Sequence, residues 1–200
     1  MTNLFYIMGK SATGKDTIYK KIKEQIKIKE YILYTTRPIR VGEKDGINYH
    51  FTTHEQIEKF EQQKKVIESR TYETVQGPWT YATIDDEQLK QKGNILTVGT
   101  LESYLKIKKY YDNNKETNVI PIYIVIDEQE RRKRAIEREK EQKNPNFAEV
   151  ERRLKADNLD FSVENLKLCN ITQKETFENY DLDKCVNEII IYINEKSAEI

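Results

Sequence analysis

The sequence predicts an α/β fold of three layers, in which helices cover both faces of a central parallel sheet. Short apolar segments alternate with segments of helical periodicity along the 200 residues, which is typical of repeated strand–helix units. The segment Val119–Ile126 is apolar throughout except for Pro121, as in strands that are buried on both faces. A glycine-rich loop joins the first strand to the first helix, at the sheet edge where such folds bind ligands.

The first strand is predicted over Leu4–Met8, and the helix that follows carries Ile18, Ile22 and Ile26 on one face. Between them lies a glycine-rich segment that matches the phosphate-binding pattern G-x-x-x-x-G-K. Its backbone N–H groups, the helix N-terminus and a lysine ammonium would together bind phosphate. We name this segment the phosphate loop, and all of its residues are candidate ATP ligands: Gly9, Lys10, Ser11, Ala12, Thr13, Gly14, Lys15, Asp16 and Thr17.

Asp16 departs from the phosphate-loop pattern, which ends in Ser or Thr. The usual hydroxyl at this position holds Mg²⁺. A carboxylate can also ligate Mg²⁺, although it places a negative charge close to the phosphates. We therefore expect Mg²⁺, bound together with ATP, as the cofactor, and Asp16 as its candidate protein ligand.

The next segments predict a small second group of strands. A strand is expected over Tyr31–Tyr34, followed by a loop rich in Pro and Gly, and then by a helix over Thr53–Lys64 that Thr53 would cap. Further strands are expected at 66–68, 71–75 and 79–83, with Trp79 packed in the core of this unit.

The remainder continues the alternation of strands and helices. We expect a helix starting at 85–87, a strand at 94–99, a helix at 101–111, a surface turn at 113–115 and the strand at 119–126. A highly charged helix follows at 127–138, where Arg131, Arg132 and Lys133 are expected to form solvated surface ion pairs. After a break at 144–146, the sequence predicts helix to 165, a short strand at 168–171 and a closing helix at 180–193.

The segment Thr35–Phe51 carries the strongest functional indication. It combines two arginines three residues apart with Thr and Tyr hydroxyls, a set that suits an oxyanion. It matches every fixed position of T-T-R-x-x-R-x-G-E-x-D-G-x-x-Y-x-F. The chain thereby resembles the guanylate kinase family. The resemblance implies a P-loop NTPase fold with a small mixed α/β insertion that binds the nucleoside monophosphate, and a helical lid.

The resemblance also implies acceptor-side residues. The members of the family hold the phosphate of GMP with arginines and tyrosines and read guanine with a Glu, so a GMP site is implied at Arg37, Arg40, Glu43, Tyr49, Glu68, Tyr81, Thr83 and Thr97. Glu73 is an alternative to Glu68 as the base-reading carboxylate. Thr97 and Gly99 stand where the family has aspartates, and Leu33 stands where it has a serine. We hypothesise that Asp16 restores the carboxylate that the metal site lacks at this strand.

The charged helix matches the lid of the family. The family pattern R-x-x-x-R, a short lid and R-L places Arg134, Arg138 and Arg153 around the transferring phosphoryl group, so these three and Lys15 are the candidate catalytic residues. Asn170 is implied near the ATP base. The implied organisation is one domain over 1–200, with its core at 1–33, 84–126 and 156–200, the monophosphate-binding subdomain at 34–83 and the lid at 127–155.

The function implied is ATP-dependent, in-line phosphorylation of a nucleoside monophosphate, with GMP or dGMP as acceptor. Ribose 1,5-bisphosphate phosphokinases, which carry G-K-D in the loop, are an enzymatic alternative. A catalytically inactive protein-binding module is an alternative of another class, against which the retained Lys15 and lid arginines argue.

Composition limits the partners and the compartment. Lys+Arg and Asp+Glu each number 34, so net charge gives no indication of a nucleic-acid polymer or a membrane surface, and we expect neither. The two cysteines, Cys169 and Cys185, have no metal-type spacing, and we expect buried thiols in a reducing compartment. The N-terminus leads directly into a strand without a signal peptide, which predicts a cytoplasmic protein. A monomer and a homodimer both remain open.

Overall fold

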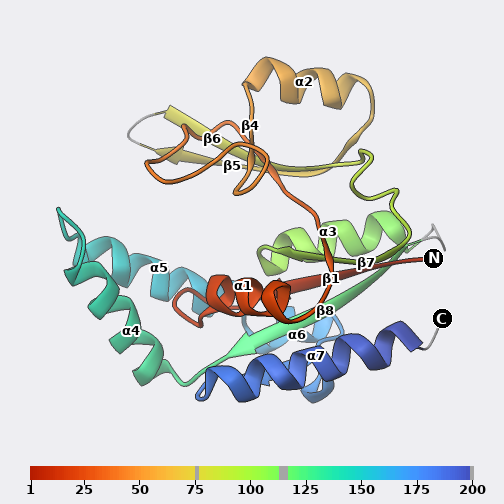
Figure 1. The fold of residues 1–200 in the computed structure, drawn as a ribbon. Coiled ribbons are helices and arrows are strands. Elements are labelled where there is room, and N and C mark those ends of the chain that lie inside the picture. The colour runs from red at the N-terminus through yellow and green to blue at the C-terminus, as the bar shows by residue number, and fades with distance from the viewer. Residues whose placement is uncertain (75–76, 113–116, 199–200) are drawn as a thin grey trace.

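The computed structural model describes residues 1–74, 77–112 and 117–198, and Figure 1 shows their arrangement. The strands are β1 (Thr2–Met8), β2 (Lys29–Glu30), β3 (Tyr34–Thr35), β4 (His50–Phe51), β5 (Val66–Thr74), β6 (Gly77–Ile84), β7 (Gly93–Val98), β8 (Thr117–Val125) and β9 (Thr176–Glu178). The helices are α1 (Lys15–Gln25), α2 (His54–Gln62), α3 (Leu101–Tyr111), α4 (Glu128–Lys140), α5 (Phe147–Asp160), α6 (Val163–Leu168) and α7 (Leu182–Ala198), with a 3₁₀ turn, η1, at Gln173–Glu175.

A parallel sheet of five strands, in the order β2-β7-β1-β8-β9, forms the core. The central strand β1 is buried along its whole length, and its side chains alternate between two apolar clusters. Leu4, Tyr6 and Met8 face one cluster, whereas Phe5 and Ile7 face the other. Because successive side chains of a strand point to opposite faces, β1 alone requires a cover on both sides. This confirms the predicted three-layer α/β fold.

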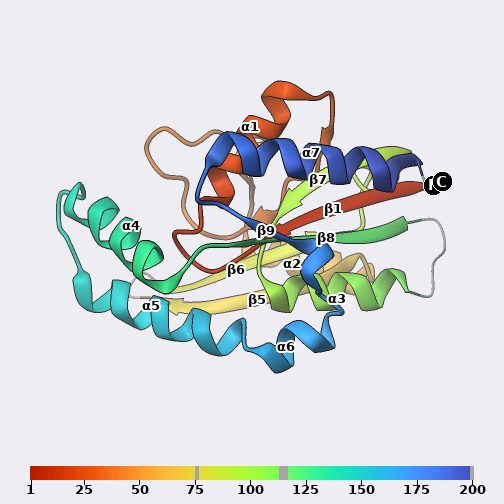
Figure 2. The same cartoon turned by 90° about the horizontal axis from the view of Figure 1, so that it is seen from below.

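The two covers are built by different helices. On one face, α1 and α7 bury Ile18, Ile22, Val186 and Ile189 against the sheet. On the other face, α3 supplies Tyr104 and Ile107, and the segment around α5 and α6 supplies Phe161 and Cys169. Figure 2 shows α7 and α1 on one side of β1 and β8, with α3 and α6 on the other. Each helix is thus held by an apolar stripe rather than by its polar surface.

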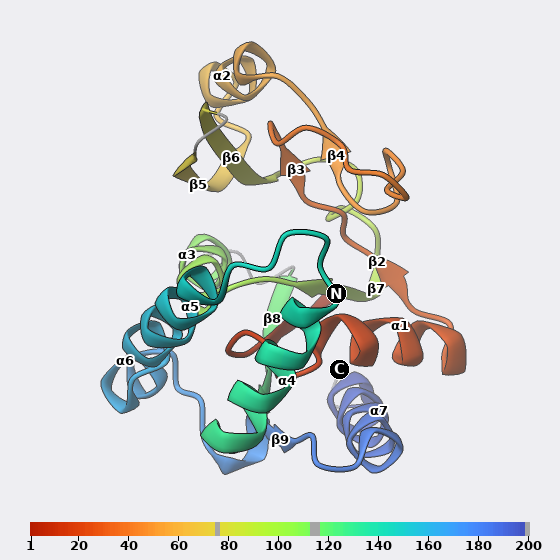
Figure 3. The same cartoon turned by 90° about the vertical axis from the view of Figure 1, so that its left-hand side faces the viewer.

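A second sheet, in the order β4-β3-β6-β5, lies apart from the core together with α2 (Figure 3). The strands β5 and β6 form an antiparallel hairpin, and β3 pairs with β6 on one side and with β4 on the other. Ile57 of α2 packs on Ala82 and Ile84, and the Thr53 side chain caps α2 as predicted. This small unit spans residues 34–84.

Three local predictions were wrong. The strand expected over Tyr31–Tyr34 is split into β2 and β3, because residues 31–33 carry the chain from one sheet to the other. No helix starts at 85–87, where the Asp86 carboxylate instead accepts from Gln88 and Tyr34 and fixes a turn. The strand expected at 168–171 is absent, because α6 runs to Leu168 and Asn170 ends it with a left-handed backbone (φ 54°).

The prediction for the cysteines is confirmed, and two other predictions lie outside the described residues. Cys169 and Cys185 are buried free thiols. Among the described residues, no helix has the length and apolar character needed to cross a membrane. The predicted turn at 113–115 and the expected strand residue Val75 lie outside the described residues.

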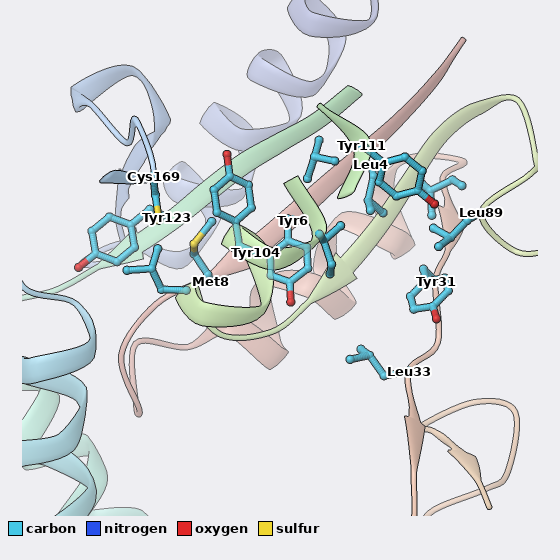
Figure 4. Close-up of a cluster of buried hydrophobic side chains, with 14 of the residues drawn as sticks. Leu4, Tyr6, Met8, Tyr31, Leu33, Leu89, Tyr104, Tyr111, Tyr123 and Cys169 are labelled. Carbon is cyan, nitrogen blue, oxygen red and sulfur yellow. The ribbon is translucent and has the colours of Figure 1, made fainter. Parts of the chain in front are cut away.

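Tyr6 explains why residue 99 is a glycine. The Tyr6 hydroxyl is buried and hydrogen-bonds Ser103 of α3, and its ring packs against Tyr104 with centroids 5.7 Å apart (Figure 4). A Cβ atom at Gly99 would lie 2.0 Å from the Tyr6 hydroxyl oxygen and 2.8 Å from Cζ. The tyrosine therefore fills the space that any side chain at position 99 would need.

We therefore predict that Gly99→Ala lowers the free energy of unfolding by about 1–3 kcal/mol through overpacking. In a Tyr6→Phe background the same substitution should cost less, because the hydroxyl makes the shorter of the two contacts. Urea denaturation of the two single variants and the double variant measures this coupling. Additive effects of the two substitutions would contradict it.

Candidate active site

The phosphate loop leads from β1 into α1, and its shape is fixed from outside by Asn179. Gly14 has φ 92°, a left-handed conformation that favours glycine, and a Cβ there would lie 2.4 Å from Asn179 Nδ2. That same Nδ2 donates to the Thr13 carbonyl over 2.7 Å. Asn179 is buried and follows β9, where its N–H donates to Val125 of β8. The core sheet therefore positions the loop through one amide side chain.

Lys15 lies folded over the loop. Its Nζ donates to the carbonyls of Gly9 (2.7 Å) and Lys10 (2.8 Å). Burial lowers the pKa of Lys15. No side chain of the described residues caps the N-terminus of α1. The first N–H groups of the helix and the lysine ammonium are thus left to bind an anion.

A cavity of about 310 Å³ opens on the phosphate loop, and we name it the loop cavity. Arg134 and Arg138, both from α4, form its opposite wall. Arg134 is oriented by Glu130, which accepts from Nε at 3.0 Å, and by the Asn179 carbonyl, which accepts from Nη2 at 3.2 Å. Two of the three predicted lid arginines therefore face the phosphate loop.

Arg153, the third predicted lid arginine, lies on α5 and faces a different space. It lines a larger cavity of about 1050 Å³, the central cavity, between the small sheet, α3 and α5. Its guanidinium lies 3.7 Å from Glu139 and 3.6 Å from Glu149. In this arrangement Arg153 is not among the lining residues of the loop cavity.

The predicted acceptor residues meet in a third space, the arginine cavity, of about 460 Å³, whose walls include Arg37, Arg40, Tyr49 and Tyr81. Arg37 is 4% exposed, and its guanidinium lies over the Tyr49 ring at 5.4 Å. The rings of Tyr49 and Tyr81 are 5.7 Å apart. A buried, oriented guanidinium flanked by two phenols is suited to an anion such as phosphate.

Glu43 supports this cavity. Its carboxylate accepts from Arg37 Nη2 at 2.7 Å and from the Arg40 backbone N–H at 2.8 Å. The hydrogen bond from Arg37 lowers the pKa of Glu43, so its negative charge is retained beside the guanidinium. Glu43, a candidate GMP ligand in the sequence, thus contacts the arginines of the site.

Asp16 links the two anion-binding cavities. It is exposed and lines both the loop cavity and the arginine cavity. Within the described ranges, no group of three or more His, Cys, Asp or Glu side chains could hold a metal ion. Among the described residues that line the loop cavity, Asp16 is the one carboxylate. This fits Mg²⁺, which binds through one or two carboxylates together with phosphate oxygens and water.

The remaining acceptor-side candidates are buried near the central cavity. Glu68 and Thr83 hydrogen-bond one another over 3.0 Å, and Glu68 is also bound by Arg70. Thr97 is buried and donates to the Tyr31 carbonyl over 3.1 Å, whereas its neighbours Val98 and Gly99 line the cavity. Trp79, expected in the core of the small unit, instead lines the central cavity and is only partly buried.

Sequence reasoning missed two residues that shape the site, Asn179 and Arg70. For Arg70 a signal existed, because residues two apart on a strand share a face, so a strand through Glu68 places the guanidinium beside the carboxylate. Asn179 follows a strand of only three residues. The prediction that Asn170 contacts the ATP base remains a prediction. Asn179 is the asparagine that lies against the phosphate loop.

Arg131 was expected to be a solvated surface residue, and this was wrong. Its side chain is fully buried and donates to Glu128 (2.6 Å), Asp157 (2.9 Å) and Asn158 (3.1 Å). The same Asp157 oxygen accepts from the Ser11 N–H of the phosphate loop at 2.8 Å. Arg131 therefore joins α4, α5 and the loop. By contrast, Arg132 and Lys133 are exposed and paired with Glu151 and Glu130, as expected.

A phosphate loop at the carboxyl end of a parallel sheet, with arginines on a neighbouring helix and a separate anion site, defines a P-loop phosphotransferase. The guanylate kinase family profile matches residues 1–177. Over 202 residues the chain is 28% identical to guanylate kinase of Fusobacterium nucleatum, and the match covers 95% of each chain. A match to guanylate kinase of Schizosaccharomyces pombe, at 31% identity, covers about half of each chain, 51%.

A solved structure shows the same fold. The crystal structure of guanylate kinase from Anaplasma phagocytophilum superposes with a TM-score of 0.60 at 18% identity, covering 98% of this chain and 86% of that one. The chain belongs to the guanylate kinase family, which is a family of nucleotide phosphotransferases.

We predict that Arg131→Met lowers the free energy of unfolding by about 3 kcal/mol, because it leaves the Glu128 and Asp157 carboxylates without their buried partner. The matched control is Arg132→Met on the same helix, which removes an exposed ion pair and should cost under about 1 kcal/mol. Urea denaturation measures both. Equal losses of unfolding free energy in the two variants would contradict a structural role for the buried Arg131.

Proposed function

We propose that the protein transfers the γ-phosphoryl group of ATP to a nucleoside monophosphate, with GMP or dGMP as the acceptor. The observation that carries the proposal is the pair of cationic cavities that share Asp16 as a wall. One contains the phosphate loop, and the other contains Arg37 and Arg40. Two phosphate groups bound in these cavities would approach one another at Asp16.

The chemistry that these residues perform is positioning and charge stabilisation. Lys15 and the loop N–H groups hold the β- and γ-phosphates of ATP, while Arg37, Arg40, Tyr49 and Tyr81 hold the acceptor phosphate. An oxygen of that phosphate attacks the γ-phosphorus in line, and ADP leaves, so no covalent intermediate with the protein forms. Arg134 and Arg138 stabilise the charge that spreads over the transferring group, and Arg153 joins them when the lid closes.

Mg²⁺, when bound with ATP, neutralises charge on the β- and γ-phosphates. Asp16 is the residue that would hold it. Asp16 lies in the first turn of α1, next to the exposed Thr17. The helix therefore fixes the position of its backbone. We further propose nucleotides as ligands in a monomer or homodimer. A cytoplasmic location is proposed too, supported by the two free thiols.

The direct test is phosphoryl transfer from ATP and Mg²⁺ to GMP, dGMP, AMP, UMP and ribose 1,5-bisphosphate. We expect turnover with GMP and dGMP. Lys15→Met should lower kcat by about 100-fold or more, because one fixed charge is lost from the phosphoryl site. Lys20→Met, an exposed lysine on the same helix, is the matched control and should leave kcat unchanged.

Other outcomes identify the alternatives. Turnover of ribose 1,5-bisphosphate alone would indicate a sugar-phosphate kinase. The absence of turnover with every acceptor, together with a lack of ATP binding, would overturn the kinase proposal and favour a protein-binding module.

A second prediction concerns the metal. Asp16→Ser should raise the Mg²⁺ concentration for half-maximal activity by at least about tenfold, because a carboxylate ligand is replaced by a neutral hydroxyl. Glu24→Gln removes an exposed carboxylate from the same helix and should not shift the Mg²⁺ dependence. An unchanged Mg²⁺ dependence in Asp16→Ser would contradict the assignment of Asp16 as a ligand.

A further inference from the structure

We propose that Arg70 is the specificity-determining residue of the acceptor site, where its guanidinium donates hydrogen bonds to O6 and N7 of a 6-oxopurine. The inference rests on the proposed function, because it concerns the base of the nucleotide whose phosphate Arg37 and Arg40 bind. It assigns to Arg70 the selection that the sequence assigned to Glu68. Because hypoxanthine and guanine both present O6 and N7, the contact with Arg70 would not distinguish between these two bases.

The central cavity adjoins the arginine cavity and offers space for the base of a bound nucleotide. The arginine cavity and the central cavity share four wall residues: Leu33, Tyr49, Tyr81 and Val98. A nucleotide whose phosphate lies at Arg37 therefore extends past the two tyrosines into the central cavity. This cavity has a volume of about 1050 Å³, which accommodates a nucleoside. Arg70 lines its wall at the junction of β5 with α3.

Glu68 is closed off from this cavity by Arg70. The Glu68 side chain is 0% exposed, and it is not among the lining residues of the central cavity. Its oxygens accept from Arg70 Nε at 3.1 Å, Arg70 Nη2 at 3.4 Å and Thr83 Oγ1 at 3.0 Å. A carboxylate that is fully covered and bound by three donors is not presented to the N–H groups of a base.

Arg70 is held rigidly with part of its donor capacity unused. Nη1 donates to Thr100 Oγ1 at 2.7 Å, and Thr100 caps α3. A guanidinium has five N–H groups, and within the described part of the chain three of them are accounted for by the bonds to Glu68 and Thr100. The Arg70 side chain is 8% exposed. Its two remaining N–H groups lie on a nearly buried guanidinium at the cavity wall.

This donor arrangement selects among bases by elementary complementarity. Guanine and hypoxanthine present two acceptors, O6 and N7, which match an arginine fork, whereas adenine presents an N6 amine donor where O6 would be. The 2-amino group distinguishes guanine from hypoxanthine. The nearby positions 33 and 99 provide only an apolar side chain and a glycine to meet it. Glu73 also lines the central cavity, but its side chain is exposed, so a hydrogen bond to it from the 2-amino group would add little.

The experiment measures both binding and turnover for GMP, IMP and AMP. Trp79 is the only tryptophan of the chain and lines the central cavity, so its fluorescence reports base binding whether or not turnover occurs. For the wild-type protein we expect GMP and IMP to bind with Kd values within about threefold of each other, and AMP to bind at least about tenfold more weakly. The ratio of kcat/KM values should follow the same order.

The variants are Arg70→Met and the double variant Glu68→Gln/Arg70→Met, which removes the carboxylate that the single variant leaves buried without its partner. Both should weaken GMP and IMP binding by about tenfold, leave AMP unaffected and so abolish the discrimination. Arg152→Met is the matched control. Arg152 lines the same cavity but is 65% exposed and paired with Glu149, so the discrimination should persist.

The outcomes separate the two proposals. A preference for GMP over IMP of more than about tenfold, or discrimination against AMP that survives in the double variant, would overturn the role of Arg70. Binding of GMP and IMP that depends on Arg70, without phosphoryl transfer to either nucleotide, would support the role of Arg70 and overturn the proposed kinase activity instead.

Discussion

The structure depends on one electrostatic constraint: cations must be gathered around two adjoining cavities without destabilising the fold. Unpaired guanidinium groups at such a density would repel one another, and burying them uncompensated would be costly. The chain meets this constraint by giving four of the arginines around the site a carboxylate partner. Arg37 pairs with Glu43, Arg70 with Glu68, Arg134 with Glu130 and Arg153 with Glu139. The site is thereby pre-organised, because each guanidinium has a fixed direction before any ligand arrives.

The degree of burial separates the roles of these pairs. Arg131 is completely buried and bound to Glu128 and Asp157, so it is committed to joining α4 and α5. Arg134 and Arg153 are each about a third exposed, and so less buried than Arg131. They pair with Glu130 and Glu139. Phosphate can replace their carboxylates at small cost, since exposed ion pairs contribute little. The same helices therefore carry one arginine that is buried between them and others that we propose for phosphate binding.

The sequence predicted those parts of the molecule that local patterns determine. The alternation of β1 follows from Leu4 to Met8, because strand periodicity and burial on both faces act over a few residues. The phosphate loop and the grouping of Arg37 with Arg40 at one cavity follow from fixed spacings in continuous segments. What the sequence could not provide are contacts between distant segments, such as Asn179 with Thr13 or Arg131 with Asp157. In the sequence, Arg131 and Arg132 are neighbouring arginines of one charged helix and cannot be told apart. Arg131 is buried and Arg132 exposed because α5 packs on one side of α4.

One path of hydrogen bonds ties the departures from the family pattern together. Tyr6 of β1 bonds Ser103, which also bonds Thr100, and Thr100 accepts from Arg70. Arg70 binds Glu68, and Glu68 in turn accepts from Thr83. The path runs from the centre of the core sheet, through the N-terminus of α3, to the hairpin of the small sheet.

Because Gly99 leaves room for the Tyr6 hydroxyl, the missing aspartate and the buried arginine belong to one arrangement. An aspartate at position 99 would displace Tyr6 and add a carboxylate beside the region where Arg70 now meets Thr100. In the proposed base site, the guanidinium of Arg70 therefore stands in the region where the family has a strand carboxylate. At the phosphate end, Asp16 is the residue positioned to replace it.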